Sequence, residues 1–192
     1  MRNKKLVWMV EIAIFAALAF ALDFVKWSMP QGGAVSLAMI PIVIMAFRRG
    51  IGAGMATGAL FGLLQIVTGM MSITPLSFEF VILQVVLEYI VAFMVIGLAG
   101  VMKNRFDEGF EEGSKGKMIG AVIVGVIFAG AIRYVIHVIA GYFFWGMYAE
   151  GNALIYSAVY NATYMIPLVL LTGIVCGLLF AAAPRLLEAK TA

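Results

Sequence analysis

Three ionisable side chains lie within stretches that are otherwise apolar enough to cross a membrane, namely Glu88, Arg133 and His137. A charged side chain is costly to bury at membrane depth, so such residues usually pair with one another or line a site for a polar solute. One interpretation is an ion pair between Glu88 and Arg133, which would neutralise both charges without a ligand. The other is a solute-binding site inside the membrane.

The spacing of residues around His137 favours a solute site. A stripe at intervals of four residues runs along one face of the predicted helix, made of Arg133, His137, Gly141 and Trp145. Gly141 is expected to leave a gap between the imidazole and the indole, where a flat ligand could lie against the backbone. Further polar and aromatic residues gather at the same predicted end of the bundle: Trp27, Gln31, Tyr89, Tyr148, Asn152, Tyr156, Tyr160, Asn161 and Tyr164.

These residue types indicate the kind of solute. A belt of Trp and Tyr at the membrane interface would explain the aromatic residues singly, but not a carboxylate, an imidazole and an amide beside them. Stacking on Trp145 stabilises a desolvated cation by ~2 kcal/mol or more, and Glu88 can accept charge-assisted hydrogen bonds from amino groups. The set predicts a small, heteroaromatic and partly cationic solute that binds from outside.

Composition decides the class of protein that positions these residues. The chain has 192 residues, of which 64% are hydrophobic and 12% charged, and its mean hydropathy is +1.07. Soluble domains are about 45–50% apolar and about 25% charged, so this is neither a soluble enzyme nor a nucleic-acid-binding module. One Cys and one His exclude a disulfide framework and a Cys/His metal cluster. The sequence carries no G-x-x-x-x-G-K-[ST] phosphate loop and has no room for an ATPase domain.

Breaks in hydropathy predict an all-α integral membrane protein, a single domain over residues 1–192 with six transmembrane helices. A helix needs about 20 apolar residues to span the bilayer. The predicted spans are residues 6–24, 34–47, 51–70, 77–102, 118–144 and 154–183. The second is short, and we expect it to be tilted, partly unwound or re-entrant. The first is expected to remain as a helix, because Glu11 interrupts an otherwise signal-peptide-like run.

The distribution of basic residues orients the six spans. Eleven of the 13 Lys and Arg residues fall on one side of the membrane if there are six spans: Arg2, Lys4, Lys5, Arg48, Arg49, Lys103, Arg105, Lys115, Lys117, Arg185 and Lys190. By the positive-inside rule, both termini are cytoplasmic. The stretch from Lys103 to Lys117 is predicted to be the one substantial cytoplasmic loop.

Two strips of small residues allow close approach between helices. Gly50, Gly54, Gly58 and Gly62 recur every four residues, and we expect this ridge to pack within the molecule. Ala13 and Ala17 share a face of the first span. Their strip is either internal packing or a docking face for another membrane protein, and the pattern alone does not choose between them.

These residues together resemble the thiamine-specific substrate-binding subunits, or S-components, of energy-coupling factor (ECF) vitamin transporters. The resemblance covers nearly the whole chain and rests on five segments: Glu11 to Phe20, Ile40 to Gly50, Leu87-Glu88-Tyr89, His137 to Ala149, and Tyr156 to Asn161. The first two segments resemble many S-components, whereas the other three are more specific to the thiamine members.

The resemblance implies a six-helix S-component fold in a bacterial cytoplasmic membrane that binds thiamine, as transported ligand and not as cofactor, near the outer surface. It implies ligand contacts from Glu88, Tyr89, His137, Gly141, Trp145, Tyr156 and Asn161, with Trp27 as a further candidate. It also implies that Ala13 and Ala17 dock on a transmembrane coupling subunit, and that two ATPase subunits are separate chains. Because Tyr156 and Asn161 lie about 140° apart on an ideal helix, we expect that helix to begin between them, or Tyr156 to reach in from a loop.

Three other functions remain as alternatives. The chain could be an S-component for another vitamin, such as riboflavin, or for a thiamine precursor. It could be an intramembrane hydrolase, which requires an activated Ser near His137, although no G-x-S-x-G setting occurs. It could be a stand-alone proton-coupled carrier that uses Glu88 or His137, although no inverted repeat is evident.

Overall fold

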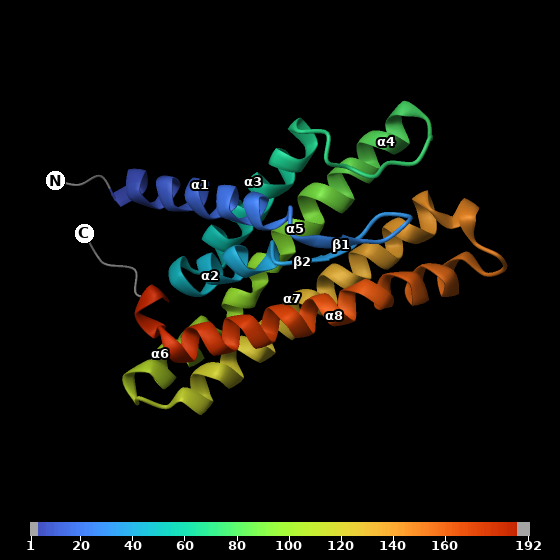
Figure 1. Ribbon diagram of the computed structural model, residues 1–192. Helices are drawn as coiled ribbons and strands as arrows, with labels where there is room; N and C mark the ends of the chain where they lie inside the picture. The colour runs from blue at the N-terminus through green and yellow to red at the C-terminus, as the bar shows by residue number, and fades with distance from the viewer. Residues whose placement is uncertain (1–3, 188–192) are drawn as a thin grey trace.

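Long helices dominate the computed structural model, which describes residues 4–187 (Figure 1). The two longest, α7 (Lys115–Phe144) and α8 (Ala153–Ala182), pack side by side along the molecule. The others are α1 (Lys4–Leu22), α2 (Met39–Arg49), α3 (Ile51–Val67) and a rod that begins with α4 (Phe78–Val85). Short 3-10 helices follow α7 and α8, namely η3 (Gly146–Tyr148) and η4 (Pro184–Leu187). The prediction of six helices is confirmed.

Four helical segments are long and apolar enough to cross a membrane. They are Lys5–Leu22, Phe78–Glu111, Lys115–Phe144 and Ala153–Ala182, and a shorter apolar helix covers Ile51–Val67. The first turn of α1 and the short helix η4 lie at the same end of the bundle (Figure 1), as an even number of spans requires. Arg2 and Lys190, which contributed to the predicted orientation, lie outside the described residues.

The second predicted span differs most from the structure. Residues 34–47 are predicted as a short span that is tilted, partly unwound or re-entrant; in the structure its first residues, Ala34–Ser36, form strand β2, which pairs antiparallel with β1 (Lys26–Ser28). Gly32 and Gly33 make the turn with φ of 84° and 79°, a backbone conformation that glycine adopts freely. Helix α2 is buried from Met39 through Phe47. Its apolar character therefore reflects burial in the protein core, and not contact with lipid.

The fourth predicted span continues into the predicted cytoplasmic loop. After α4 the rod proceeds through a π-helical turn η1 (Val86–Val91), α5 (Ala92–Met94), a 3-10 segment η2 (Val95–Met102) and α6 (Lys103–Glu111). The expected loop is therefore mostly helix, and a short turn after α6 leads to Ser114, which caps α7. Ion pairs such as Lys103 to Asp107, at 2.5 Å, link side chains one helical turn apart and support α6.

The glycine ridge of α3 packs inside the molecule, as predicted for three of its four members. A Cβ at Gly58 would overlap the carbonyl oxygen of Phe93, and one at Gly62 would overlap that of Tyr89. A Cβ at Gly54 would crowd Ala46 and Gly97, whereas nothing lies within 4 Å of such an atom at Gly50. The ridge thus lets α3 approach the rod at the π-helical turn that carries Glu88 and Tyr89.

We expect Gly62→Ala to destabilise the protein, because the added methyl group meets backbone and not a side chain that could move aside. Overpacking costs about 1–3 kcal/mol, partly offset by the roughly 1 kcal/mol that Ala gains over Gly in a helix. The midpoint of thermal unfolding in detergent should fall. Gly52→Ala is the matched control, because it lies on the same helix with open space around it; an equal midpoint for the two variants would contradict the packing role.

Candidate functional site

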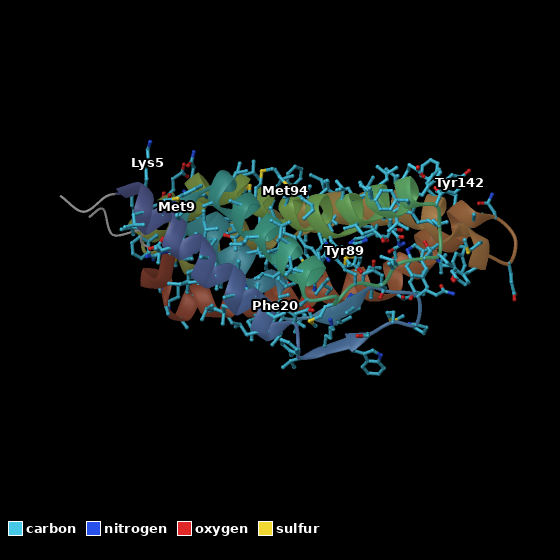
Figure 2. The ribbon with its side chains drawn as sticks, turned by 90° about the horizontal axis from the view of Figure 1, so that it is seen from above. Lys5, Met9, Phe20, Tyr89, Met94 and Tyr142 are labelled. Carbon is cyan, nitrogen blue, oxygen red and sulfur yellow. The ribbon has the colours of Figure 1, made fainter. Side chains whose placement is uncertain are left out.

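A cavity lies between the β1–β2 hairpin, α3, η1, α7 and α8. Its volume is ≈ 140 Å³, about ten times what one buried water requires, so a small organic molecule can enter. Figure 2 shows Lys5 and Tyr142 near opposite ends of the molecule, with Tyr89 of the cavity wall between them. Of the eight predicted contacts, all but Trp27 line this cavity: Glu88, Tyr89, His137, Gly141, Trp145, Tyr156 and Asn161.

Glu88 forms an acidic pole at one wall of the cavity. One carboxylate oxygen accepts from Gln84 Nε2 at 2.8 Å, and the other accepts from Trp145 Nε1 at 3.1 Å. Thr74 donates to the carbonyl oxygen of Gln84 through its backbone N–H and its hydroxyl, at 3.3 and 3.1 Å, which leaves the amide N–H₂ facing Glu88. The carboxylate is therefore oriented by neutral donors, so its negative charge remains available to a cationic solute.

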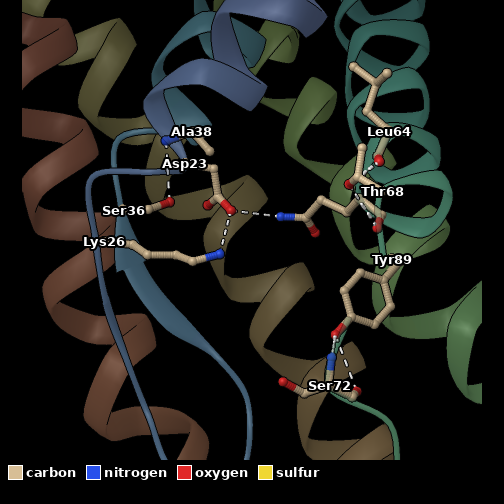
Figure 3. Close-up of polar contacts among 9 residues, drawn as sticks. Asp23, Lys26, Ser36, Ala38, Leu64, Thr68, Ser72 and Tyr89 are labelled. Atoms are coloured by element: carbon tan, nitrogen blue, oxygen red, sulfur yellow. Dashed lines mark hydrogen bonds and ion pairs between the residues drawn. The ribbon is translucent and has the colours of Figure 1, made fainter. Parts of the chain in front are cut away.

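The π-helical turn η1 places Glu88 and Tyr89 at this wall. Such turns are rare and frequently occur at functional sites. The Tyr89 hydroxyl accepts from Ser72 N at 2.6 Å and donates to Ser72 O at 3.2 Å (Figure 3). The ring is thereby fixed against the loop before α4, and both residues of the predicted pair contribute to one wall.

Arg133 and His137 form a second pole, one helical turn apart on α7. Arg133 is 6% exposed, and its guanidinium carbon lies 4.4 Å from the centre of the Phe93 ring. Its Nε donates to His137 Nε2 at 3.3 Å. Within residues 4–187 no ion pair joins Arg133 to Glu88, so the interpretation in which these two charges neutralise each other is wrong.

Gly141 allows α7 and α8 to pack closely and does not leave the gap for a ligand that the sequence suggested. A Cβ there would overlap Ser157 Oγ and crowd Asn161 Nδ2, so α8 occupies the space that the sequence assigned to a flat ligand. The Ser157 hydroxyl donates to Val138 O at 2.8 Å and not to the imidazole. Because the hydrolase alternative required an activated Ser at His137, this arrangement gives it no support.

Tyr156 and Asn161 both reach the cavity from within α8, contrary to the expected helix start between them. The helix begins at Ala153, and its inner face is broad enough to include both residues. Asn161 lies deeper, where its amide N–H₂ donates to His137 O, Ser157 O and Ser157 Oγ at 3.2, 2.9 and 3.2 Å. Its oxygen accepts from Tyr164 at 2.6 Å. Asn161 therefore lines the cavity with an amide that also joins α7 to α8.

The hairpin covers one side of the cavity and is held by tyrosines of α8. The Tyr156 hydroxyl donates to Gln31 Oε1. The Tyr160 hydroxyl accepts from Gln31 N at 2.8 Å and donates to Gly32 O at 3.0 Å. A Cβ at Gly33 would meet the Tyr164 ring at 2.5 Å, so glycine is required for the hairpin to lie this close to α8.

Trp27, the remaining candidate contact, does not line the cavity. Side chains of a strand alternate between two faces, and Lys26 and Ser28 on either side of Trp27 face the cavity. Trp27 points the other way and is 78% exposed. It is withdrawn from the ligand contacts.

Sequence reasoning missed a buried carboxylate at the base of the hairpin. Asp23 is 4% exposed, and its Oδ2 accepts from Lys26 Nζ at 2.7 Å and from Gln65 Nε2 at 2.9 Å (Figure 3). The signal was present, because Asp23 and Gln65 both fall inside predicted spans. Ser72 also lines the cavity without having been singled out, whereas Tyr160 and Tyr164 were placed at this end of the bundle but not among the ligand contacts. Among the residues that the structure describes, no group of three His, Cys, Asp or Glu side chains could hold a metal ion.

Comparisons with known proteins identify the family of the chain. The model of the family described as thiamine transporter protein matches residues 9–188. The chain is 43% identical to the thiamine transporter ThiT of Bacillus subtilis (strain 168), covering 100% of this chain and 99% of that protein. It is 33% identical to the ThiT of Lacticaseibacillus paracasei, covering 98% and 94% of the two chains.

Solved structures extend the likeness to the fold. ThiT from Listeria monocytogenes superposes with a TM-score of 0.87 at 34% identity, over 97% of this chain and 100% of that one. The S component of a bacterial ECF transporter superposes with a TM-score of 0.51 at 19% identity, over 95% of each chain. The family is one of transporters and not of enzymes. A family match over residues 9–188, with relatives at 43% and 33% identity along their whole length, shows that this multi-pass membrane protein belongs to the thiamine transporter family.

Proposed function

We propose that this chain is the thiamine-binding S-component of an ECF-type uptake transporter and that thiamine occupies the cavity described above. The observation that carries the proposal is the acidic pole, in which Trp145 and Glu88 stand next to each other and are joined by a hydrogen bond of 3.1 Å. An aromatic face beside a carboxylate suits a flat ligand that carries both a cationic ring and an amino group. The names of the ThiT relatives supply the same ligand.

The proposed contacts are Glu88, Tyr89, His137, Gly141, Trp145, Tyr156 and Asn161, which share the cavity. The hairpin lies over it, away from the end of the bundle that holds the first turn of α1 and η4 (Figure 1). If the termini are cytoplasmic, as the positive-inside rule predicts, the cavity belongs to the outer half of a bacterial cytoplasmic membrane. That position suits uptake of a solute from outside.

The proposed docking surface for the coupling subunit is the outward face of α1. Ala13 and Ala17 are exposed, whereas Ile12, Ala16 and Ala19 form the buried face of the same helix. A partner helix can approach a strip of small residues closely. We propose that a transmembrane coupling subunit packs there and that two ATPase subunits on separate chains supply the energy.

Titration of intrinsic Trp fluorescence with a panel of vitamins tests the ligand. Trp145 lies at the cavity, so its fluorescence should report a ligand ring stacked on it. We expect thiamine to saturate the protein at one molecule per chain and to be recovered unchanged. Riboflavin, thiamine phosphates and the isolated pyrimidine fragment are the comparison ligands. Tighter binding of any of these than of thiamine would reassign the ligand, and transport by this chain alone in liposomes would restore the carrier alternative.

We expect Glu88→Gln to weaken thiamine binding by about 1.5–3 kcal/mol, the range for hydrogen bonds to a charged group. The change is nearly isosteric, but it removes the negative charge and leaves one acceptor oxygen, so only one of the two donors, Gln84 Nε2 or Trp145 Nε1, keeps its partner. Isothermal titration calorimetry on purified protein measures it. Glu79→Gln is the matched control, because Glu79 lies on the same rod but does not line the cavity. Equal affinities for the two variants would remove Glu88 from the ligand contacts.

A further inference from the structure

The contact between Arg133 and His137 has a consequence for the imidazole. An arginine guanidinium has five N–H donors and no acceptor. Its Nε donates to His137 Nε2 at 3.3 Å, so Nε2 has to present a lone pair. In a neutral imidazole one nitrogen carries the proton and the other accepts. The proton of His137 therefore resides on Nδ1.

We propose that Arg133 is a positioning residue that holds His137 in the neutral form protonated on Nδ1, so that the imidazole offers the cavity a hydrogen-bond donor. The position of Arg133 is itself fixed, because its guanidinium lies over the Phe93 ring and the residue is 6% exposed. The imidazole also meets the Tyr164 ring edge-on at 6.1 Å between centroids, and Asn161 donates to the backbone carbonyl of His137, which ties this turn of α7 to α8.

The protonated nitrogen is the one that a solute can reach. Nδ1 makes no hydrogen bond with any of residues 4–187, and none of the fully enclosed side-chain nitrogen and oxygen atoms in this range lacks a partner. Nδ1 is therefore not enclosed by protein, and His137 lines the cavity. The group of the solute that faces it must be an acceptor. For thiamine, which this step takes from the proposed function, the group that faces His137 is therefore a hydrogen-bond acceptor.

The same contact argues against His137 as a proton carrier. A second proton, on Nε2, would set an N–H group against the N–H of Arg133 and remove the hydrogen bond between them. The neutral donor form is the one that the Arg133 contact stabilises. A stand-alone carrier that cycles a proton through this imidazole would have to break that contact in every cycle.

The tautomer can be measured directly because His137 is the chain's one histidine. Protein grown with ring-¹⁵N-labelled histidine and purified without ligand gives a single imidazole in the nitrogen spectrum. We expect the directly bonded proton on Nδ1 and a lone pair on Nε2. A proton on Nε2, or on both nitrogens, at neutral pH would overturn the proposal. This measurement does not depend on which vitamin binds, so a failure of the thiamine proposal leaves it intact.

Substitutions at Arg133 then test the causal step. Arg133→Met keeps the length of the side chain but has no hydrogen-bond donor. We expect the imidazole proton of His137 to move to Nε2, in part or wholly. The dissociation constant for thiamine should rise about tenfold, as the loss of one good hydrogen bond would give. Arg133→Lys keeps a side chain that can donate but not accept a hydrogen bond. This variant should keep the His137 proton on Nδ1 and retain most of the thiamine affinity of the wild type. Arg133→Met with an unchanged tautomer would overturn the proposal.

A second background separates action through His137 from any direct effect of Arg133. In His137→Asn the side-chain amide sits at the position of Nδ1 and carries donors whatever Arg133 does. We expect Arg133→Met to change thiamine affinity by less than about threefold in this background, under ~0.7 kcal/mol. A full tenfold loss in the Asn background would show that Arg133 acts on the ligand by another route and would overturn its assignment as a positioning residue.

Discussion

Trp145→Ala is expected to abolish tight thiamine binding and to remove most of the ligand-induced quenching of fluorescence. The indole contributes a stacking face worth ~2 kcal/mol for a desolvated cation. Its N–H also donates to Glu88 at 3.1 Å, a bond to a charged group worth about 1.5–3 kcal/mol. Losing the stacking face alone raises the dissociation constant about thirtyfold or more, and losing the hydrogen bond within the protein removes the group that orients Glu88 for the ligand. Calorimetry and fluorescence on the same sample measure the two effects.

Trp145→Phe separates the two contributions, because Phe keeps an aromatic face but has no N–H. Affinity should fall between wild type and the Ala variant. The other two tryptophans serve as internal controls: Trp8 and Trp27 are 38% and 78% exposed, and neither lines the cavity. Full quenching in Trp145→Ala would assign the signal to one of them and would remove the stacked ring from the site.

The helices and the residues of the site could be predicted where one physical signal dominated. Apolar runs of about 20 residues located α1, α7 and α8 to within a few residues, because lipid demands such a run. Intervals of four residues brought His137 and Trp145 to the same cavity, because α7 is regular up to Phe144. The same reasoning failed for residues 34–36, where two glycines with positive φ turn an apolar run into a hairpin.

The contacts between side chains could not be predicted in the same way, because they depend on how helices cross. Glu88 and Arg133 were candidates for an ion pair from charge alone, but η1 aims the carboxylate at Gln84 and Trp145 instead. Gly141 looked like a space for a ligand, but α8 fills it with Ser157. Asp23 was hidden at the end of the first span, and its burial follows from the hairpin and α3 folding over it.

Ala13→Trp and Ala17→Trp are expected to leave thiamine affinity within about threefold of wild type, under ~0.7 kcal/mol, and to abolish ATP-dependent uptake. Both alanines face outward from α1, and neither lines the cavity, so an indole there changes the outer surface and not the ligand site. With no phosphate loop of its own, the chain can draw on ATP only through contact with another protein. A bulky side chain on the small-residue strip should prevent close approach of the coupling subunit.

Ile166→Trp on α8 is the matched control, since Ile166 is 60% exposed and lies away from the strip. This variant should keep thiamine binding, co-purification with the coupling subunit and uptake. Normal uptake by both alanine variants would place the docking surface elsewhere on the molecule, whereas loss of thiamine binding along with uptake would mean that α1 packs differently against α2 and α3.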